Sequence, residues 1–373
     1  MIREEMKLRN RFLNYGAITL IILGSACSYL PKAQTSMPTA SLVTPTETII
    51  FSTQTDWNEK GVLEVDVLEI PLPEQIANRF MEFSSMAWLG DELILLPQYP
   101  NRLNPEGLGA LYAVNKADIL SYIDQPDENP LPIREISFDD GGLSKSIPGF
   151  EGFEAIAFAD QQVFMTIETH NGDPMMGYLV AGSFDELSKQ ISLNPQTLVE
   201  LLPQTSFLNA SDEALTIYNN RIYTFFEDNG VSQNPQVKAH VFDLNLKPEG
   251  IIPFPNIEYR VTDATETRED GTFWIMNYFY PGDEHLAADD DPLIRQYGIG
   301  ETHKQFDGVE RIVEMKIEKD FIQLVEGAPL YLRLLLDGES RNWECIVRLD
   351  DIGFLLVTDS FPRTIFGFVQ DLR

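Results

Sequence analysis

The chain has 373 residues, which is enough for one large domain or two small ones. Its formal net charge is −31, and hydrophobic residues make up 43% of it. A surface this acidic repels nucleic acid, whose binding requires Lys and Arg against phosphates, and it repels anionic membranes. The composition therefore excludes a nucleic-acid partner. It suits a soluble extracytoplasmic protein, or one that collects divalent cations.

The N-terminal segment has the order of a secretory signal. Residues 1–11 carry several Lys and Arg, an apolar run follows over residues 15–23, and small residues precede Cys27. This order predicts a signal peptide over residues 1–26, and the run is too short to span a bilayer. The position of Cys27 resembles a lipobox, so we expect lipidation there and attachment to the extracytoplasmic face of a bacterial cell envelope. Simple secretion and a retained anchor are the alternatives.

Thr, Ser and Pro dominate the next segment, residues 27–56, which predicts a flexible tether. From Trp57 onward, short runs of β-branched and aromatic residues alternate with Gly, Asn, Asp and Pro, which indicates strands. Helices are expected to be short at most, at residues 118–123 and 184–191. We therefore predict one all-β domain over residues 57–373, and a monomer. With Cys27 lipidated, Cys345 has no partner for an intrachain disulfide.

A degenerate internal repeat indicates the architecture of this domain. Each copy has a polar start, an apolar strand, a turn and a second apolar strand; the copies span residues 84–101, 154–172, 213–230, 263–282 and 344–363. Each copy resembles the inner hairpin of a four-stranded blade, and two further strands follow each of the first four. The repeat therefore predicts a β-propeller of five four-stranded blades. Six blades are the alternative if residues 282–330 contain another hairpin, and a long β-sandwich or two β domains are further alternatives.

The last blade lacks one strand, because only residues 365–369 follow the fifth copy as a strand. One alternating strand is left over at residues 62–70. Since propellers protect their blade edges by closing the ring, we expect this N-terminal strand to complete the last blade.

Acidic side chains recur at the start of the first strand and the end of the second strand of these hairpins. If the hairpins are innermost, these ends converge at one mouth of the central channel. Crowded carboxylates cannot all ionise without a counter-charge, and an oxygen-only set favours Ca²⁺. The predicted metal ligands are Glu154, Glu168, Glu213, Glu227, Asp263, Glu344 and Asp359. The alternative is that these residues cap strands.

Arginines are scarce, and four of them fall near the predicted mouth: Arg79, Arg260, Arg341 and Arg363. Guanidinium groups match phosphate oxygens, so these residues are candidates for binding a phosphorylated substrate. Salt bridges to the acidic ring are the alternative role. The long segment 281–308 is a candidate lid over the same mouth.

Four short motifs resemble the phytase-like, esterase-like propeller family: EGFEAIAF (151–158), DGTFW (270–274), NWECIVRL (342–349) and LLVTDSF (355–361). Relative to that family, Asp263 replaces the usual Glu and Cys345 the usual Gly, and the first repeat has Ser85. MEFSSMAW (81–88) is also similar to a motif of calcium-activated apyrases, which have five blades around an axial calcium. Both resemblances imply a calcium-dependent phosphoester hydrolase that acts on a small phosphorylated substrate at the channel mouth, with catalytic residues unassigned. The alternative is a non-catalytic binding propeller in which calcium is structural.

Overall fold

The computed structural model describes residues 56–57 and 62–373, apart from 173 and 207–209. The chain divides into two units, Met1–Phe51 and Ser52–Arg373. The predicted signal peptide, Cys27 and nearly all of the predicted tether lie outside the described residues. Among the helices that the structure describes, none is long and apolar enough to cross a membrane.

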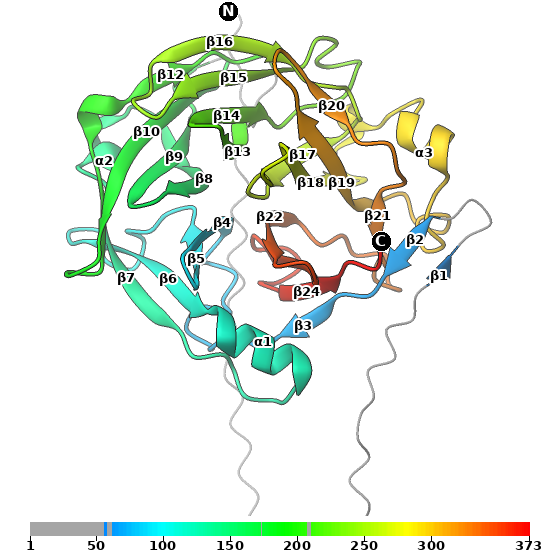
Figure 1. Cartoon of the computed structure of the whole chain (residues 1–373), viewed down its shortest axis with the longest axis horizontal. Coiled ribbons are helices and arrows are strands. Elements are labelled where there is room, and N and C mark those ends of the chain that lie inside the picture. The colour runs from blue at the N-terminus through cyan, green and yellow to red at the C-terminus, as the bar shows by residue number, and fades with distance from the viewer. Residues whose placement is uncertain (1–55, 58–61, 173, 207–209) are drawn as a thin grey trace, which may run out of the picture. The chain divides into compact units, whose positions relative to one another are not determined.

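Five antiparallel hairpins surround a central axis in the second unit (Figure 1). Their first strands are β4 (Phe83–Leu89), β8 (Phe150–Ala159), β13 (Asp212–Tyr218), β17 (Arg260–Ala264) and β22 (Trp343–Leu349). Their second strands are β5 (Glu92–Pro97), β9 (Gln162–Thr169), β14 (Arg221–Phe226), β18 (Thr272–Phe279) and β23 (Gly353–Thr358). The first strands contact one another in a closed cycle, β4–β8–β13–β17–β22–β4. The fold is therefore an all-β propeller.

Apart from three N-terminal strands described below, the remaining strands follow the hairpins along the chain. They are β6 (Gly109–Asn115), β7 (Arg134–Asp139), β10 (Met176–Asp185), β11 (Gln190–Leu193), β12 (Val199–Leu201), β15 (Lys238–Asp243), β16 (Pro248–Pro253), β19 (Val309–Ile317), β20 (Ile322–Leu324), β21 (Leu330–Leu332) and β24 (Phe366–Gln370). Because β7 and β11 also pair, in parallel, hydrogen bonding groups the described strands into sheets of nine, seven, four and four strands. The blade count of five stays a prediction of the repeat.

The described helices are short: α1 (Lys116–Asp124), α2 (Leu143–Ser146), α3 (Pro292–Tyr297) and the 3₁₀ turns η1 (Pro195–Thr197) and η2 (Glu284–Leu286). The expected helix at residues 118–123 is confirmed as α1, which Asn115 caps by accepting a hydrogen bond from Ala117 N. The expected helix at 184–191 is wrong, because β10 turns there into β11. Asp185 accepts hydrogen bonds from the N–H groups of Leu187 and Ser188, which stabilises the turn.

The N-terminal segment closes the ring, as expected, but as more than one strand. β3 (Leu68–Ile70) pairs antiparallel with β24, the last strand of the chain. β2 (Leu63–Val65) pairs in parallel with β21 of the preceding sheet, and β1 (Asp56–Trp57) pairs with β2. Figure 1 shows these blue strands beside the red and orange end of the chain. One N-terminal segment thus bridges two sheets.

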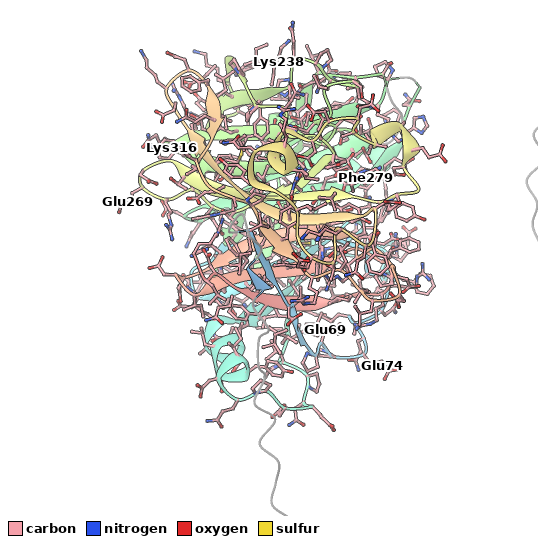
Figure 2. The ribbon with its side chains drawn as sticks, turned by 90° about the vertical axis from the view of Figure 1, so that its right-hand side faces the viewer. Glu69, Glu74, Lys238, Glu269, Phe279 and Lys316 are labelled. Carbon is pink, nitrogen blue, oxygen red and sulfur yellow. The ribbon has the colours of Figure 1, made fainter. Side chains whose placement is uncertain are left out.

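The hydrophobic core consists of separate clusters between successive hairpin groups. Aromatic pairs cross these interfaces, for example Phe225 with Phe273 at 5.3 Å and Trp274 with Phe354 at 5.6 Å between ring centroids. Strands such as β18 are consequently buried on both sides. In Figure 2, Glu269, which precedes β18, and Phe279, its last residue, lie on opposite faces of the ring. The inner strands therefore run from one face to the other.

Candidate functional site

A β-bulge interrupts every inner hairpin close to the start of its first strand. Pairing skips one residue at an equivalent position in each hairpin, and these residues are Ser84, Glu154, Glu213, Thr262 and Glu344. The β8–β9 hairpin has a second irregularity, which skips Glu151. A bulge re-aims the side chain of the extra residue and bends the strand. All five skipped side chains are polar, so the repeat supplies a polar group at the same structural position in each hairpin.

Most of these residues line one cavity of about 200 Å³, which we call the axial cavity. It is lined by Glu82, Phe83, Ser84, Gln98, Glu154, Glu168, Glu213, Arg260, Asn342, Glu344 and Asp359. Gly152 makes room for the close approach of two of these side chains. Its φ is +145°, and a Cβ there would lie 2.3 Å from Cγ of Gln98 and 2.9 Å from Oε1 of Glu154. Five of the seven predicted metal ligands thus meet in one place.

Glu227, another predicted metal ligand, does not line the axial cavity. It is fully buried and forms an ion pair with Arg260, which does line the cavity. The other guanidinium nitrogen of Arg260 donates to Asp283 Oδ2 at 3.0 Å. Arg260 therefore connects the carboxylates of the axial cavity to segment 281–308. Its Nε is buried and has no hydrogen-bond partner among the described residues.

Asp263 follows the bulge by one residue and does not line the axial cavity. Its carboxylate accepts hydrogen bonds from Ile346 N at 2.9 Å and from Ser85 Oγ at 3.3 Å. Since Ser85 lies on β4 and Ile346 on β22, this carboxylate ties three inner strands together. Its structural equivalents in the other hairpins are Ser85, Ala155, Ala214 and Cys345. The bulge position is therefore held by Ser84 in the first repeat and by Thr262 in the fourth, one residue before Ser85 and Asp263, which the repeat pattern predicts to be equivalent to the three glutamates.

The hydroxyls of these two residues serve the ring itself. Ser84 Oγ donates to the carbonyl oxygen of Phe153 at 2.6 Å, and Thr262 Oγ1 donates to that of Trp343 at 2.6 Å. Each bond joins one inner strand to the next around the axis. The hydroxyls at two bulge positions thus join neighbouring inner strands, whereas the three glutamates supply carboxylates to the axial cavity.

Burial and mutual repulsion raise the pKa values of the clustered carboxyls. Burial, followed by the charge of Glu168, raises the pKa of Glu154 well above its usual range. Burial, followed by Glu227 and then Glu344, does the same for Glu213. For Glu227, burial raises the pKa and the adjacent Arg260 guanidinium opposes the rise. The cavity therefore favours protons or another cation among its carboxylates.

The donor chemistry of the axial cavity fits a hard cation, since its acidic ligands offer only oxygen. Glu168 Oε1 and Glu227 Oε2 are buried and accept no hydrogen bond from any described residue. Within the described part of the chain, however, no three His, Cys, Asp or Glu side chains stand close enough together to hold a metal ion as they are. A cation would therefore have to draw the glutamate side chains together.

Stability should depend on pH through Glu168, because burial raises its pKa to about 6 from 4.5. A raised carboxyl pKa means that the folded state binds the proton more tightly. Its stabilising contribution is full below pH 4.5 and is lost as the pH rises through 6. In EDTA, the free energy of unfolding should fall by on the order of 2 kcal/mol more in the wild type than in Glu168→Gln between pH 4.5 and 7.5. Urea titrations over that range measure it, and parallel curves for the two proteins would contradict the assignment.

A larger cavity of about 760 Å³, which we call the outer pocket, shares Arg260, Asn342 and Asp359 with the axial cavity. Its other lining residues are Arg79, Tyr278, Tyr280, Asp283, Gly338, Glu339, Ser340, Phe361 and Pro362. The predicted substrate residues Arg79 and Arg260 meet here. The outer pocket lies at the ends of second strands, since Asp359 directly follows β23 and Tyr280 follows β18.

Arg341 and Arg363 lie elsewhere. Arg341 is buried and bonds Glu310 through its backbone N at 2.9 Å and its Nε at 3.0 Å. Arg363 is exposed and forms an ion pair with Glu69 of β3. Both arginines thus form salt bridges, but their partners Glu310 and Glu69 lie outside the predicted acidic ring.

Sequence reasoning missed the aromatic wall of the outer pocket and several residues of the axial cavity, including Glu82, Ser84 and Asn342. Aligning the hairpins on the bulge residue would have found Ser84. Tyr280 directly follows β18, and Phe361 comes three residues after the end of β23. Their places just beyond a second strand, where a hairpin opens toward the mouth, were the signal that could have found them.

No family model matches the sequence, and no curated protein matches it. The chain is similar in structure to a glucose dehydrogenase, at 12% identity, a TM-score of 0.43 and coverage of 82% of this chain and 99% of that chain. It is also similar to the soluble aldose sugar dehydrogenase of Escherichia coli in its apo form, at 10% identity, a TM-score of 0.40 and coverage of 82% and 99%. A third structure is a GH43B protein of the Bacteroides ovatus xyloglucan PUL, at 12% identity, a TM-score of 0.44 and coverage of 81% and 54%. Similarity at this level assigns no activity to the chain. Fold and site together define a β-propeller with an axial cluster of carboxylates.

Proposed function

We propose that this propeller is a calcium-dependent phosphoester hydrolase of the phytase-like, esterase-like kind, with the axial cavity as its Ca²⁺ site. The observation that carries the proposal is the convergence of five carboxylates from three inner hairpins on one cavity that shares residues with an arginine-containing pocket. Oxygen-only donors in this number favour Ca²⁺ over zinc or copper. Glu168 Oε1 is buried and accepts no hydrogen bond from a described residue, which supports its role as a cation ligand.

The groups that would hold the cation are the carboxylates of Glu154, Glu168, Glu213, Glu344 and Asp359. When bound, Ca²⁺ supplies charge stabilisation to a phosphoryl oxygen. Arg79 and Arg260 line the outer pocket and would bind the remaining phosphate oxygens. Asp359 lines both cavities and would therefore lie between the carboxylate cluster and the substrate. Hydrolysis adds water to the phosphorus and breaks the ester P–O bond, releasing an alcohol and phosphate.

A second candidate is a non-catalytic binding propeller in which Ca²⁺ only rigidifies the ring. The ion pairs of Arg260 favour this alternative. Two of its guanidinium nitrogens already bind the carboxylates of Glu227 and Asp283 and so are not free for a phosphate. For either function, the proposed location is the extracytoplasmic face of a bacterial membrane, with Cys27 as the lipid-bearing residue.

Phosphate release from 4-nitrophenyl phosphate, by the chain from Cys27 onward, tests the enzyme against the binding propeller. We expect turnover at least tenfold higher in Ca²⁺ than in EDTA, since losing one charge-stabilising interaction costs about a factor of ten or more. Glu213→Gln should lose most of this dependence, whereas Glu135→Gln, which removes one exposed charge from β7, should keep it. If the protein binds calcium but hydrolyses no phosphoester, the hydrolase is rejected and the non-catalytic binding propeller is supported. Turnover that ignores calcium would reject the metal-dependent mechanism.

A further inference from the structure

The outer pocket is large enough for a small organic molecule. Its volume of about 760 Å³ falls within the range of roughly 300–1,000 Å³ that is typical of ligand pockets. It shares Arg260, Asn342 and Asp359 with the axial cavity. A ligand that places one group at the axial cavity therefore extends its other end into the outer pocket.

Two half-exposed aromatic side chains form part of the pocket wall. Tyr280 is 50% exposed and Phe361 is 56% exposed, although both line this cavity, and Tyr278 is buried beside them. Aromatic rings bind other flat rings by stacked or edge-on contacts that contribute about 0.5–1.5 kcal/mol beyond simple burial. A flat ligand ring would cover apolar surface that solvent now contacts.

The guanidinium of Arg79 is oriented by this wall. Its Cζ lies 4.8 Å from the centroid of the Phe361 ring, which fits a cation–π contact. It forms no ion pair with any residue that the structure describes. Its N–H groups remain available to the oxygens of an anion beside the ring that Phe361 would contact.

The charges of the pocket limit how much negative charge a ligand can carry. Arg79 and Arg260 face the carboxylates of Asp283, Glu339 and Asp359 in the same cavity. Asp283 is paired with Arg260. Two guanidinium groups can bind a single phosphate, but the three carboxylates repel a polyanion.

We propose that the outer pocket binds a phosphomonoester of a flat aromatic alcohol, and that it discriminates against sugar and inositol polyphosphates. The inference rests on the proposed function for the ester chemistry. It rests on Tyr280, Phe361 and Arg79 for the aromatic part. The phosphate points to Arg260 and the axial cavity, and the ring lies against the aromatic wall.

Binding of phosphonates separates this inference from the activity, because a C–P bond is not hydrolysed. Calorimetry in Ca²⁺ compares phenylphosphonate, cyclohexylphosphonate and phytate on the chain from Cys27 onward. We expect phenylphosphonate to bind at least tenfold more tightly than the other two. Phe361→Leu and Tyr280→Leu should each remove most of the preference for the flat ring. Arg79→Gln should weaken the binding of phenylphosphonate and of cyclohexylphosphonate by the same factor.

Phe321→Leu is the matched control, because Phe321 is an exposed aromatic residue between β19 and β20 and does not line the pocket. Equal affinities for the two phosphonates, or tighter binding of phytate, would overturn the inference. So would turnover of 4-nitrophenyl phosphate that Phe361→Leu and Tyr280→Leu leave unchanged. If phenylphosphonate binds with the expected preference while no phosphoester is hydrolysed, the pocket assignment stands and the proposed hydrolase fails.

Discussion

Adding Ca²⁺ should raise the melting temperature of the protein, and EDTA should lower it. The carboxylates of Glu154, Glu213 and Glu344 are crowded in one cavity, and burial raises their pKa values well above the usual range. A cation that binds only the folded chain stabilises it by mass action, by about 2.7 kcal/mol at a hundredfold excess over the dissociation constant. Thermal unfolding followed by circular dichroism, with Ca²⁺, with Mg²⁺ and with EDTA, measures the shift.

Glu213→Gln should change stability in opposite directions with and without the metal. In EDTA, the substitution removes a carboxyl that folding either leaves charged among Glu227 and Glu344 or forces to take up a proton. The variant should therefore melt higher than the wild type in EDTA. In Ca²⁺ it should melt lower, because one ligand has lost its charge.

Glu135→Gln removes the same charge from an exposed position and should shift both melting curves little. A capping role for Glu213 predicts a similar loss of stability in both conditions. If the melting curve changes neither with calcium nor with EDTA, the proposed cation site is rejected, and so is the metal-dependent hydrolase.

Deleting residues 57–72 should abolish stable folding. The deletion removes β2 and β3, which pair with β21 and β24 in two different sheets. It also removes the buried side chains of Leu63, Val65 and Ile70. Each such side chain contributes about 1.5–3 kcal/mol by burial, so the loss approaches the whole stability of a typical domain, about 5–15 kcal/mol. The freed edges of β21 and β24 should then cause aggregation.

Size-exclusion chromatography and urea titration measure this result. Deletion of residues 28–51, which belong to the other unit, is the matched control and should leave the unfolding midpoint unchanged. A soluble, monomeric Δ57–72 protein with an unchanged midpoint would contradict closure by the N-terminal strands.

The repeat made the inner hairpins predictable, because a strand, a turn and a second strand are local features. It also placed Glu154, Glu213 and Glu344 correctly at the start of three first strands. In the first and fourth copies the repeat placed the bulge residue one position too late. A bulge shifts strand pairing by one residue, and the alternation of apolar and polar residues along the sequence does not reveal it. The repeat spacing predicted Asp263 as a metal ligand at the channel mouth. In the structure its carboxylate instead joins three inner strands by hydrogen bonds.

The sequence by itself determined the all-β class, the hairpins, the strand that closes the ring and the acidic character of one channel mouth. Each of these follows from residue type and near-neighbour spacing. Only the tertiary structure decided which charges meet. It joined Arg260 to Glu227 and Asp283, Arg341 to Glu310 and Arg363 to Glu69. It also brought Tyr280 and Phe361, from different hairpins, into one pocket. Such pairings depend on how twisted hairpins pack around the axis, and residues far apart in the chain become neighbours only when the ring closes.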